Sequence, residues 1–153
     1  MEIVEGTEII TLRFPKEDKL HHRSLVEGLF RMGHSFYDFP FRVTWRILSE
    51  EELQKNFRHH VPAGIGKLQL MITVPKKKRK LAVDRVLMRR RIREAFRLNR
   101  INLKEKVENN SEIRTMSMSL IYIHDKNLPY VVVEEKLKGL LGKLLTRLPI
   151  EEI

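Results

Sequence analysis

Apolar and polar residues alternate along two segments of the chain, residues 41–47 and 68–74. A period of two is typical of a β-strand with one buried face. The inward residues are predicted to be Phe41, Val43, Trp45, Ile47, Leu68, Leu70, Ile72 and Val74, opposite Arg42, Thr44, Arg46, Gln69, Met71 and Thr73. Residues 116–124 are predicted to form another strand. Residues 36–39 form a short edge strand in this interpretation, because Pro40 cannot donate a ladder hydrogen bond.

Helical periodicity marks three other segments. Residues 13–33 are predicted to be a first helix, starting near Pro15 and ending at Gly33. Its apolar face carries Leu25, Val26, Leu29, Phe30 and Met32. Residues 85–100 form a second helix, and the chain closes with a third over residues 130–148, although residues 130–133 also favour a strand. A short helix is possible within residues 101–115.

The remaining internal segment, residues 49–66, has no sustained period and ends in turn residues. We expect it to be a long, mobile hairpin connection. The predicted element order is therefore α-β-β-β-α-(α)-β-α. At 153 residues the chain suits a single domain over 1–153, with a core at about 13–148.

The net charge of the chain indicates what kind of molecule it binds. The 30 Lys and Arg residues outnumber the 20 Asp and Glu residues, which gives a net charge of +10 and indicates a polyanionic partner. No apolar run approaches the roughly 18–20 residues that a membrane-spanning helix needs. The start of the chain is acidic, unlike a secretory signal. Because there is no cysteine, disulfides and thiolate chemistry are excluded, and a cytoplasmic location is expected.

The helix at 85–100 concentrates this charge. On a helical wheel one side carries Arg85, Arg89, Arg90, Arg93, Arg97 and Arg100, opposite Leu87, Met88, Ile92, Ala95, Phe96 and Leu98. A solvated helix face would interleave acids four residues away, and Glu94 is the only acid between Arg85 and Arg100. Arginine also suits phosphate oxygens and base stacking. The pattern favours nucleic-acid binding over the alternative of a merely solvated face.

A second basic motif precedes this helix. "PKKKRK" at 75–80 has the form of a nuclear localisation signal. However, it joins an apolar strand directly to the basic helix, where its amines extend the arginine side. We therefore interpret it as part of the same anion-binding surface.

The segments "ITVPKK", "AVDR" and "RRRIREAFRLNR", together with "FPKEDKLHHRSLVEGLF", resemble the bacterial ribonuclease P protein component. The resemblance covers roughly residues 13–148. It implies an α/β (α+β) two-layer sandwich with a central mixed sheet of about four strands. It also implies a likeness to a domain of some ribosomal proteins, and a left-handed βαβ crossover through the basic helix.

Position by position, the resemblance and the charge pattern assign RNA binding to Lys76, Lys77, Lys80, Arg85, Arg89, Arg90, Arg93 and Arg97. Two residues depart from the family pattern: Val86 stands where the family has Asn, and Leu87 where it has Arg. One polar contact to RNA or to a hydrated metal is therefore missing or supplied elsewhere, and Arg91 or Lys80 could compensate in charge.

The resemblance implies the protein subunit of ribonuclease P, with the catalytic RNA and precursor tRNA as partners and no DNA. The catalytic RNA removes the 5′ leader of precursor tRNA with Mg²⁺ held mainly by RNA. A leader-binding cleft between the first helix and the sheet would include Val26, Phe30 and Thr73. Val26 replaces an aromatic residue of the family. Phe30 as an ordinary core residue is the alternative.

The chain itself is expected to be catalytically silent and to hold no metal. The pairs His21–His22 and His59–His60 lack the Cys or carboxylate neighbours that would complete a zinc site. Asp84 and Glu94 are expected to be ion-pair partners of arginines. Two other functions stay open: a ribosomal or RNA-chaperone protein without associated cleavage, and a protein-only nuclease, which would need a carboxylate cluster.

Overall fold

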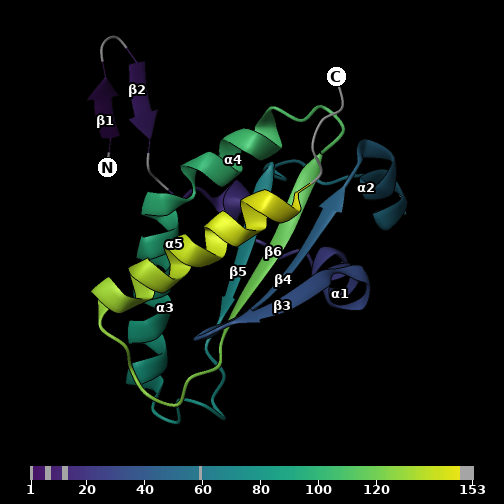
Figure 1. Ribbon diagram of the computed structural model, residues 1–153. Coiled ribbons are helices and arrows are strands. Elements are labelled where there is room, and N and C mark those ends of the chain that lie inside the picture. Colours follow the sequence, from purple (N-terminus) through teal and green to yellow (C-terminus); the bar gives the residue numbers. More distant parts are fainter. Residues whose placement is uncertain (1, 6–7, 12–13, 59, 149–153) are drawn as a thin grey trace.

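The computed structural model describes residues 2–5, 8–11, 14–58 and 60–148. Its centre is a four-stranded mixed sheet in the order β3-β4-β6-β5, as Figure 1 shows. The strands are β3 (His34–Asp38), β4 (Phe41–Leu48), β5 (Leu68–Thr73) and β6 (Thr115–Tyr122). β4 pairs antiparallel with β3 and β6, whereas β5 runs parallel to β6. β1 (Glu2–Glu5) and β2 (Glu8–Thr11) form a separate antiparallel pair.

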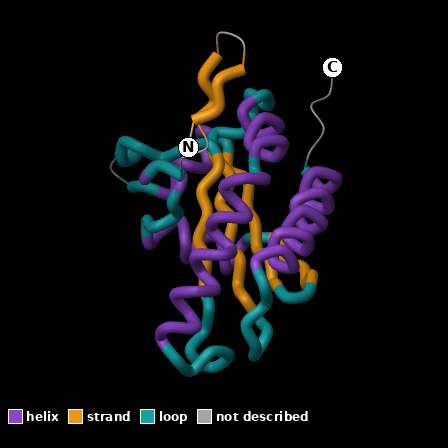
Figure 2. Tube along the Cα trace, turned by 90° about the vertical axis from the view of Figure 1, so that its left-hand side faces the viewer, coloured by secondary structure: helices purple, strands orange, loops and turns teal. Residues whose placement is uncertain are grey.

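Helices cover both faces of the sheet, which Figure 2 shows edge-on. α3 (Ala82–Asn99), α4 (Ile101–Glu108) and α5 (Tyr130–Arg147) pack on one face and enclose the main core. This sheet and its helical layer form the predicted sandwich, and α5 is helical from Tyr130 onward. α1 (Arg23–Met32) and α2 (Glu50–Asn56) enclose a smaller cluster with Leu48 and Ile65. None of the described helices is both long and apolar enough to cross a membrane.

The connection from β5 to β6 runs through α3 and α4. In Figure 1 both strands run from top to bottom, β6 lies to the right of β5, and the helices lie on the near side of the sheet. The crossover is therefore left-handed, against the strong right-handed default for parallel strands. It places α3 at the β5 edge of the sheet.

The predicted inward residues of β4 are buried or half-buried, but its other face differs from the prediction. Thr44 is 2% exposed and Arg46 is 8% exposed. Arg46 lies under Gly28 of α1, where a Cβ atom would stand 2.3 Å from its Nη1. The strand is thus covered on both faces toward its C-terminal end, because α1 packs over the polar side.

The predicted start of the first helix was wrong. Lys16–Asp18 form a 3-10 turn, η1, and α1 begins only at Arg23. Between them, Lys19 bridges to Leu70 of β5, and the backbone N–H of Leu20 donates to the carbonyl of Leu70 at 2.9 Å. This pairing with the sheet edge holds the backbone extended and prevents a continuous helix.

The prediction of a long hairpin connection at 49–66 was also wrong. α2 lies within it, and Ser49 and Glu52 form a capping box: Ser49 Oγ accepts from the N–H of Glu52 at 3.2 Å, and Glu52 Oε1 accepts from the N–H of Ser49 at 3.1 Å. The segment does not join hairpin partners, since β6 lies between β4 and β5. The Ser-x-x-Glu spacing was a visible helix signal.

Candidate nucleic-acid interface

α3 buries one side and exposes the other. Met88, Ile92, Ala95 and Phe96 are fully buried in the main core. Arg90 and Arg93 are exposed on the opposite side, as the wheel predicted. Leu87, assigned to the apolar side, is 37% exposed, and Val86 is 38% exposed among the arginines. The exposed side of α3 is thus mostly cationic, with an apolar gap where the family pattern has Asn and Arg.

The basic segment at 75–80 is a folded turn. The N–H groups of Lys78 and Arg79 both donate to the carbonyl of Pro75 at 3.0 Å. Arg79 turns inward and pairs with Asp84 at 3.0 Å, as expected for that acid. The exposed cations are Lys76, Lys77, Lys78 and Lys80. This turn therefore presents its lysines to solvent at the N-terminal end of α3.

Arg85 holds this turn against the helix. Its Nη1 donates to the carbonyl oxygens of Arg79 at 2.9 Å and Lys80 at 2.7 Å. Its side chain is half-buried. Arg91, proposed to compensate for the missing family residues, donates to the carbonyl of Leu128 and so fastens α3 to the loop before α5. Both arginines have structural contacts, which leaves fewer cations available to an RNA than the sequence suggested.

Arg97 is paired with an acid. Its Nε and Nη2 donate to the two carboxylate oxygens of Glu94, at 3.1 and 2.5 Å. The hydrogen bond from Arg97 lowers the pKa of Glu94, and the same bond raises the pKa of Arg97. Glu94 is therefore ionised at neutral pH and offsets one charge of the predicted arginine row.

Arg89 and Arg93 line a groove that the sequence did not reveal. Its volume is about 310 Å³, and it lies between α3, β5 and the segment before α1. Lys19 and His21 line the same groove, together with Phe14. These side chains come from two segments about seventy residues apart in the chain. The pairing of Lys19 with the β5 edge helps to bring them together, and no sequence motif signals it.

A buried ion pair fixes the segment that carries Lys19. Nη1 of Arg100 lies 2.7 Å from Oδ2 of Asp18, and their side chains are 5% and 4% exposed. Lys104 approaches the same oxygen at 3.6 Å. The guanidinium of Arg100 also lies over the ring of Phe14, 5.0 Å from its centroid. Arg100, counted on the exposed arginine side by the wheel, is therefore buried because it faces Asp18.

The three residues predicted to line the leader-binding cleft lie on α1 and on the sheet face that α1 partly covers. Val26 is half-buried and packs on the same small cluster as Met71 of β5. Phe30, one turn further along, is 47% exposed. Thr73 is half-buried at the end of β5. Phe30 is thus accessible to a ligand, which disfavours the alternative of an ordinary core residue.

Thr73 belongs to a row of residues across the sheet. It pairs with Ile121, which pairs with Arg42, which in turn pairs with Tyr37. Directly opposed residues point to the same face, and three strand spacings span about 14 Å. Tyr37 is 68% exposed, and the guanidinium of Arg42 lies 5.7 Å from its ring centroid. The row adds an exposed aromatic ring and a cation that the sequence analysis missed.

Metal ligands do not gather in the described ranges: no group of three or more His, Asp or Glu side chains is placed to hold an ion there. The rings of His21 and His22 stack with centroids 4.3 Å apart. Burial, and secondly the neighbouring His21, lower the pKa of His22. Residue 59 of the other His pair lies outside the described residues.

Comparison with known proteins decides the family. Residues 14–145 match the family model for ribonuclease P. The chain belongs to the ribonuclease P protein family. It is 27% identical over 111 residues to the ribonuclease P protein component of Porphyromonas gingivalis, a match that covers 72% of each chain. A role in tRNA 5′ processing, as the protein component of a ribonucleoprotein enzyme, follows from membership of this family.

Solved structures confirm the fold. The Staphylococcus aureus RNase P protein matches with a TM-score of 0.56 at 21% identity, covering 83% of this chain and 94% of that chain. The Thermotoga maritima RNase P protein matches with a TM-score of 0.55 at 22% identity, covering 82% and 96%. The α+β architecture that the resemblance implied is therefore confirmed.

Proposed function

We propose that this family member binds the catalytic RNA of ribonuclease P through one basic interface, formed by Lys19, Lys76, Lys77, Lys80, Arg89, Arg90 and Arg93. The observation that supports it most strongly is the groove in which Arg89 and Arg93 of α3 meet Lys19 and His21 of a distant segment. Cations held at fixed spacing on two elements suit the phosphates of a folded RNA. Arg85 and Arg97 support the interface indirectly, since they are hydrogen-bonded within the chain.

The 5′ leader of precursor tRNA is assigned to the surface between α1 and the sheet. Phe30 and Tyr37 offer exposed rings there, and Arg42 and Thr73 offer a cation and a hydroxyl group. Unpaired bases stack on aromatic rings with little sequence preference, which suits a protein that accepts many leaders. The ring of Tyr37 compensates for the aromatic side chain that is missing at Val26.

Chemistry is assigned to the RNA. Because the described side chains form no acidic cluster, the Mg²⁺ ions are expected to be held by phosphates of the catalytic RNA and substrate. When bound there, such ions would supply a metal-activated water for hydrolysis of the phosphodiester. The protein's residues orient the leader and neutralise phosphate charge.

Reconstitution tests this proposal. Rigorously RNA-free protein should not cleave precursor tRNA, and addition of a bacterial ribonuclease P RNA with Mg²⁺ should restore 5′ maturation. Cleavage by the protein alone would instead support a protein-only nuclease. If the RNA that co-purifies with the protein is ribosomal or mixed, and no stimulation of the catalytic RNA is seen, the ribosomal or RNA-chaperone alternative replaces it.

A further inference from the structure

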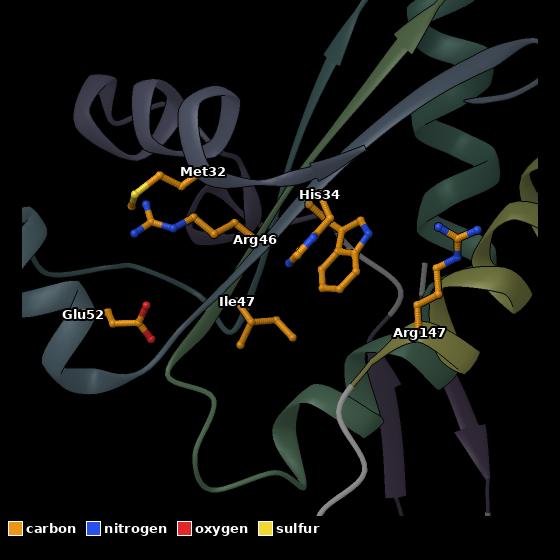
Figure 3. Close-up of a pocket in the computed structure, with 7 residues that line it drawn as sticks. Met32, His34, Arg46, Ile47, Glu52 and Arg147 are labelled. Atoms are coloured by element: carbon orange, nitrogen blue, oxygen red, sulfur yellow. The ribbon is translucent and has the colours of Figure 1, made fainter. Parts of the chain in front are cut away.

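A second cavity lies at the opposite edge of the sheet from α3. It has a volume of about 690 Å³ and is lined by Met32, His34, Trp45, Arg46, Glu52 and Arg147, together with Ile47 (Figure 3). It forms where β3 begins at His34, opposite Trp45, while β4 continues to Leu48 without a β3 neighbour. We call this cavity the edge groove.

The edge groove carries the guanidinium groups of Arg46 and Arg147, and the carboxylate of Glu52 interacts electrostatically with Arg46. A smaller adjoining cavity shares Met32, Arg46 and Glu52 with it and adds Arg31 and Lys55. Within the described part of the chain, Arg31, Arg46 and Arg147 form no ion pair. Nη1 of Arg46 is buried without a hydrogen-bond partner. Among the described residues that line the two cavities, Glu52 is the single acid, so the groove suits an anion.

Aromatic stacking accompanies this charge. The rings of His34 and Trp45 lie with centroids 4.8 Å apart and planes inclined by 37°. His34 is exposed, so its outer face can stack on a further planar ring. Arg147 lies over the ring of Phe36, 4.3 Å from its centroid, which holds the guanidinium at the rim of the groove. A phosphate group or an acidic peptide would use only the cations, whereas a nucleotide uses both features.

We propose that the edge groove binds a nucleotide of the single-stranded precursor leader, upstream of the nucleotide at Phe30. Its base stacks on His34, and its phosphate lies beside Arg147 at the rim of the groove. This inference rests on the proposed function. The leader is favoured over the catalytic RNA because the basic interface lies at the other sheet edge, whereas Phe30 and Met32 share the last turn of α1. A strand passing around that turn reaches the groove.

The single tryptophan provides a direct probe, because Trp45 lines the groove. A single-stranded oligoribonucleotide should quench its fluorescence, and Arg147→Gln should weaken that binding. In the reconstituted holoenzyme, the comparison uses precursors with leaders of roughly four and roughly twelve nucleotides, a short and a longer length within the range of about 4–16 nucleotides that single-strand sites span. Arg147→Gln and His34→Ala should weaken the long-leader precursor at least about fivefold, the lower end of one stacked base. Short-leader precursor and mature tRNA should bind as before.

Lys136→Ala is the matched control, since it removes one exposed positive charge from the same helix about 16 Å away along its axis. It should leave the long-leader advantage intact. Equal loss for both leader lengths, no loss, or weaker assembly with the catalytic RNA would each overturn the proposal. If precursor and mature tRNA bind the wild-type holoenzyme equally, the leader assignment at Phe30 fails. The edge groove is then tested by the fluorescence of Trp45 alone. If a single-stranded oligoribonucleotide quenches this fluorescence, the groove binds single-stranded RNA; if it does not, the proposal is wrong.

Discussion

Asp18 and Arg100 form a buried ion pair across 82 positions of sequence, with Arg100 Nη1 2.7 Å from Asp18 Oδ2. The pair joins η1 to the junction of α3 and α4. It thereby holds the segment that carries Lys19 and His21 beside Arg89. The arrangement of the proposed basic interface therefore depends on a buried contact.

Asp18→Asn should destabilise the protein by about 3–5 kcal/mol, because it leaves the buried guanidinium of Arg100 without its countercharge. Urea unfolding measures the loss. Glu27→Gln is the control: its ion pair with Arg23 is 63% and 93% exposed and should contribute little. Equally small losses for the two variants would mean that Asp18 does not hold this segment in place.

The salt dependence of the affinity for catalytic RNA should distinguish arginines that are available to phosphates from arginines that are paired within the protein. Arg89→Ala should flatten the plot of log affinity for catalytic RNA against log salt by about one unit, as one phosphate contact is lost. Arg97→Ala should flatten it less, because Glu94 already neutralises Arg97.

The reciprocal variant sharpens this test. Glu94→Gln removes the acid and should steepen the salt slope, since Arg97 becomes available to a phosphate. Salt titrations of the three variants beside wild type provide the comparison. An unchanged salt slope for Arg89→Ala would mean that the arginine side of α3 is merely solvated and does not contact RNA.

Phe30→Ala should weaken precursor tRNA binding to the holoenzyme by about 1–3 kcal/mol, the contribution of one stacked base. Mature tRNA should bind as before, because it has no leader. Phe30 is 47% exposed, so the melting temperature should fall only slightly. Leu29→Ala, at a fully buried neighbour, should cost about 2–5 kcal/mol of stability instead. Parallel losses for both tRNAs would remove Phe30 from the leader site.

Acid should weaken the contact between α3 and α5 through Glu134. Hydrogen bonds, first from Asn99 and then from Tyr130, lower the pKa of Glu134 below its usual 4.5. Because the folded pKa is depressed, this stabilisation is present above 4.5 and is lost as the pH falls through the folded value. Glu134→Gln should therefore reduce stability at neutral pH and narrow its difference from wild type at low pH. Denaturant midpoints across that range measure it, and a constant difference would contradict the prediction.

Local pattern determined most of the elements and the identity of the basic surface. The period-two segments became β4 and β5, and the amphipathic arginine helix became α3. Such patterns report which side of an element is buried, and each is complete within a few turns of chain. The α2 capping box was equally local, at Ser49 and Glu52, and it was overlooked rather than absent.

Tertiary structure alone decided which cations an RNA can reach. Arg85, Arg97 and Arg100 look equivalent to Arg89 on a helical wheel, yet they contact backbone carbonyls, Glu94 and Asp18 respectively. The sequence by itself specified how many guanidinium groups α3 carries and on which side. It also indicated the local partner Glu94, but not the partner of Arg100, because Asp18 comes from a distant segment that is placed only when the sheet edge forms.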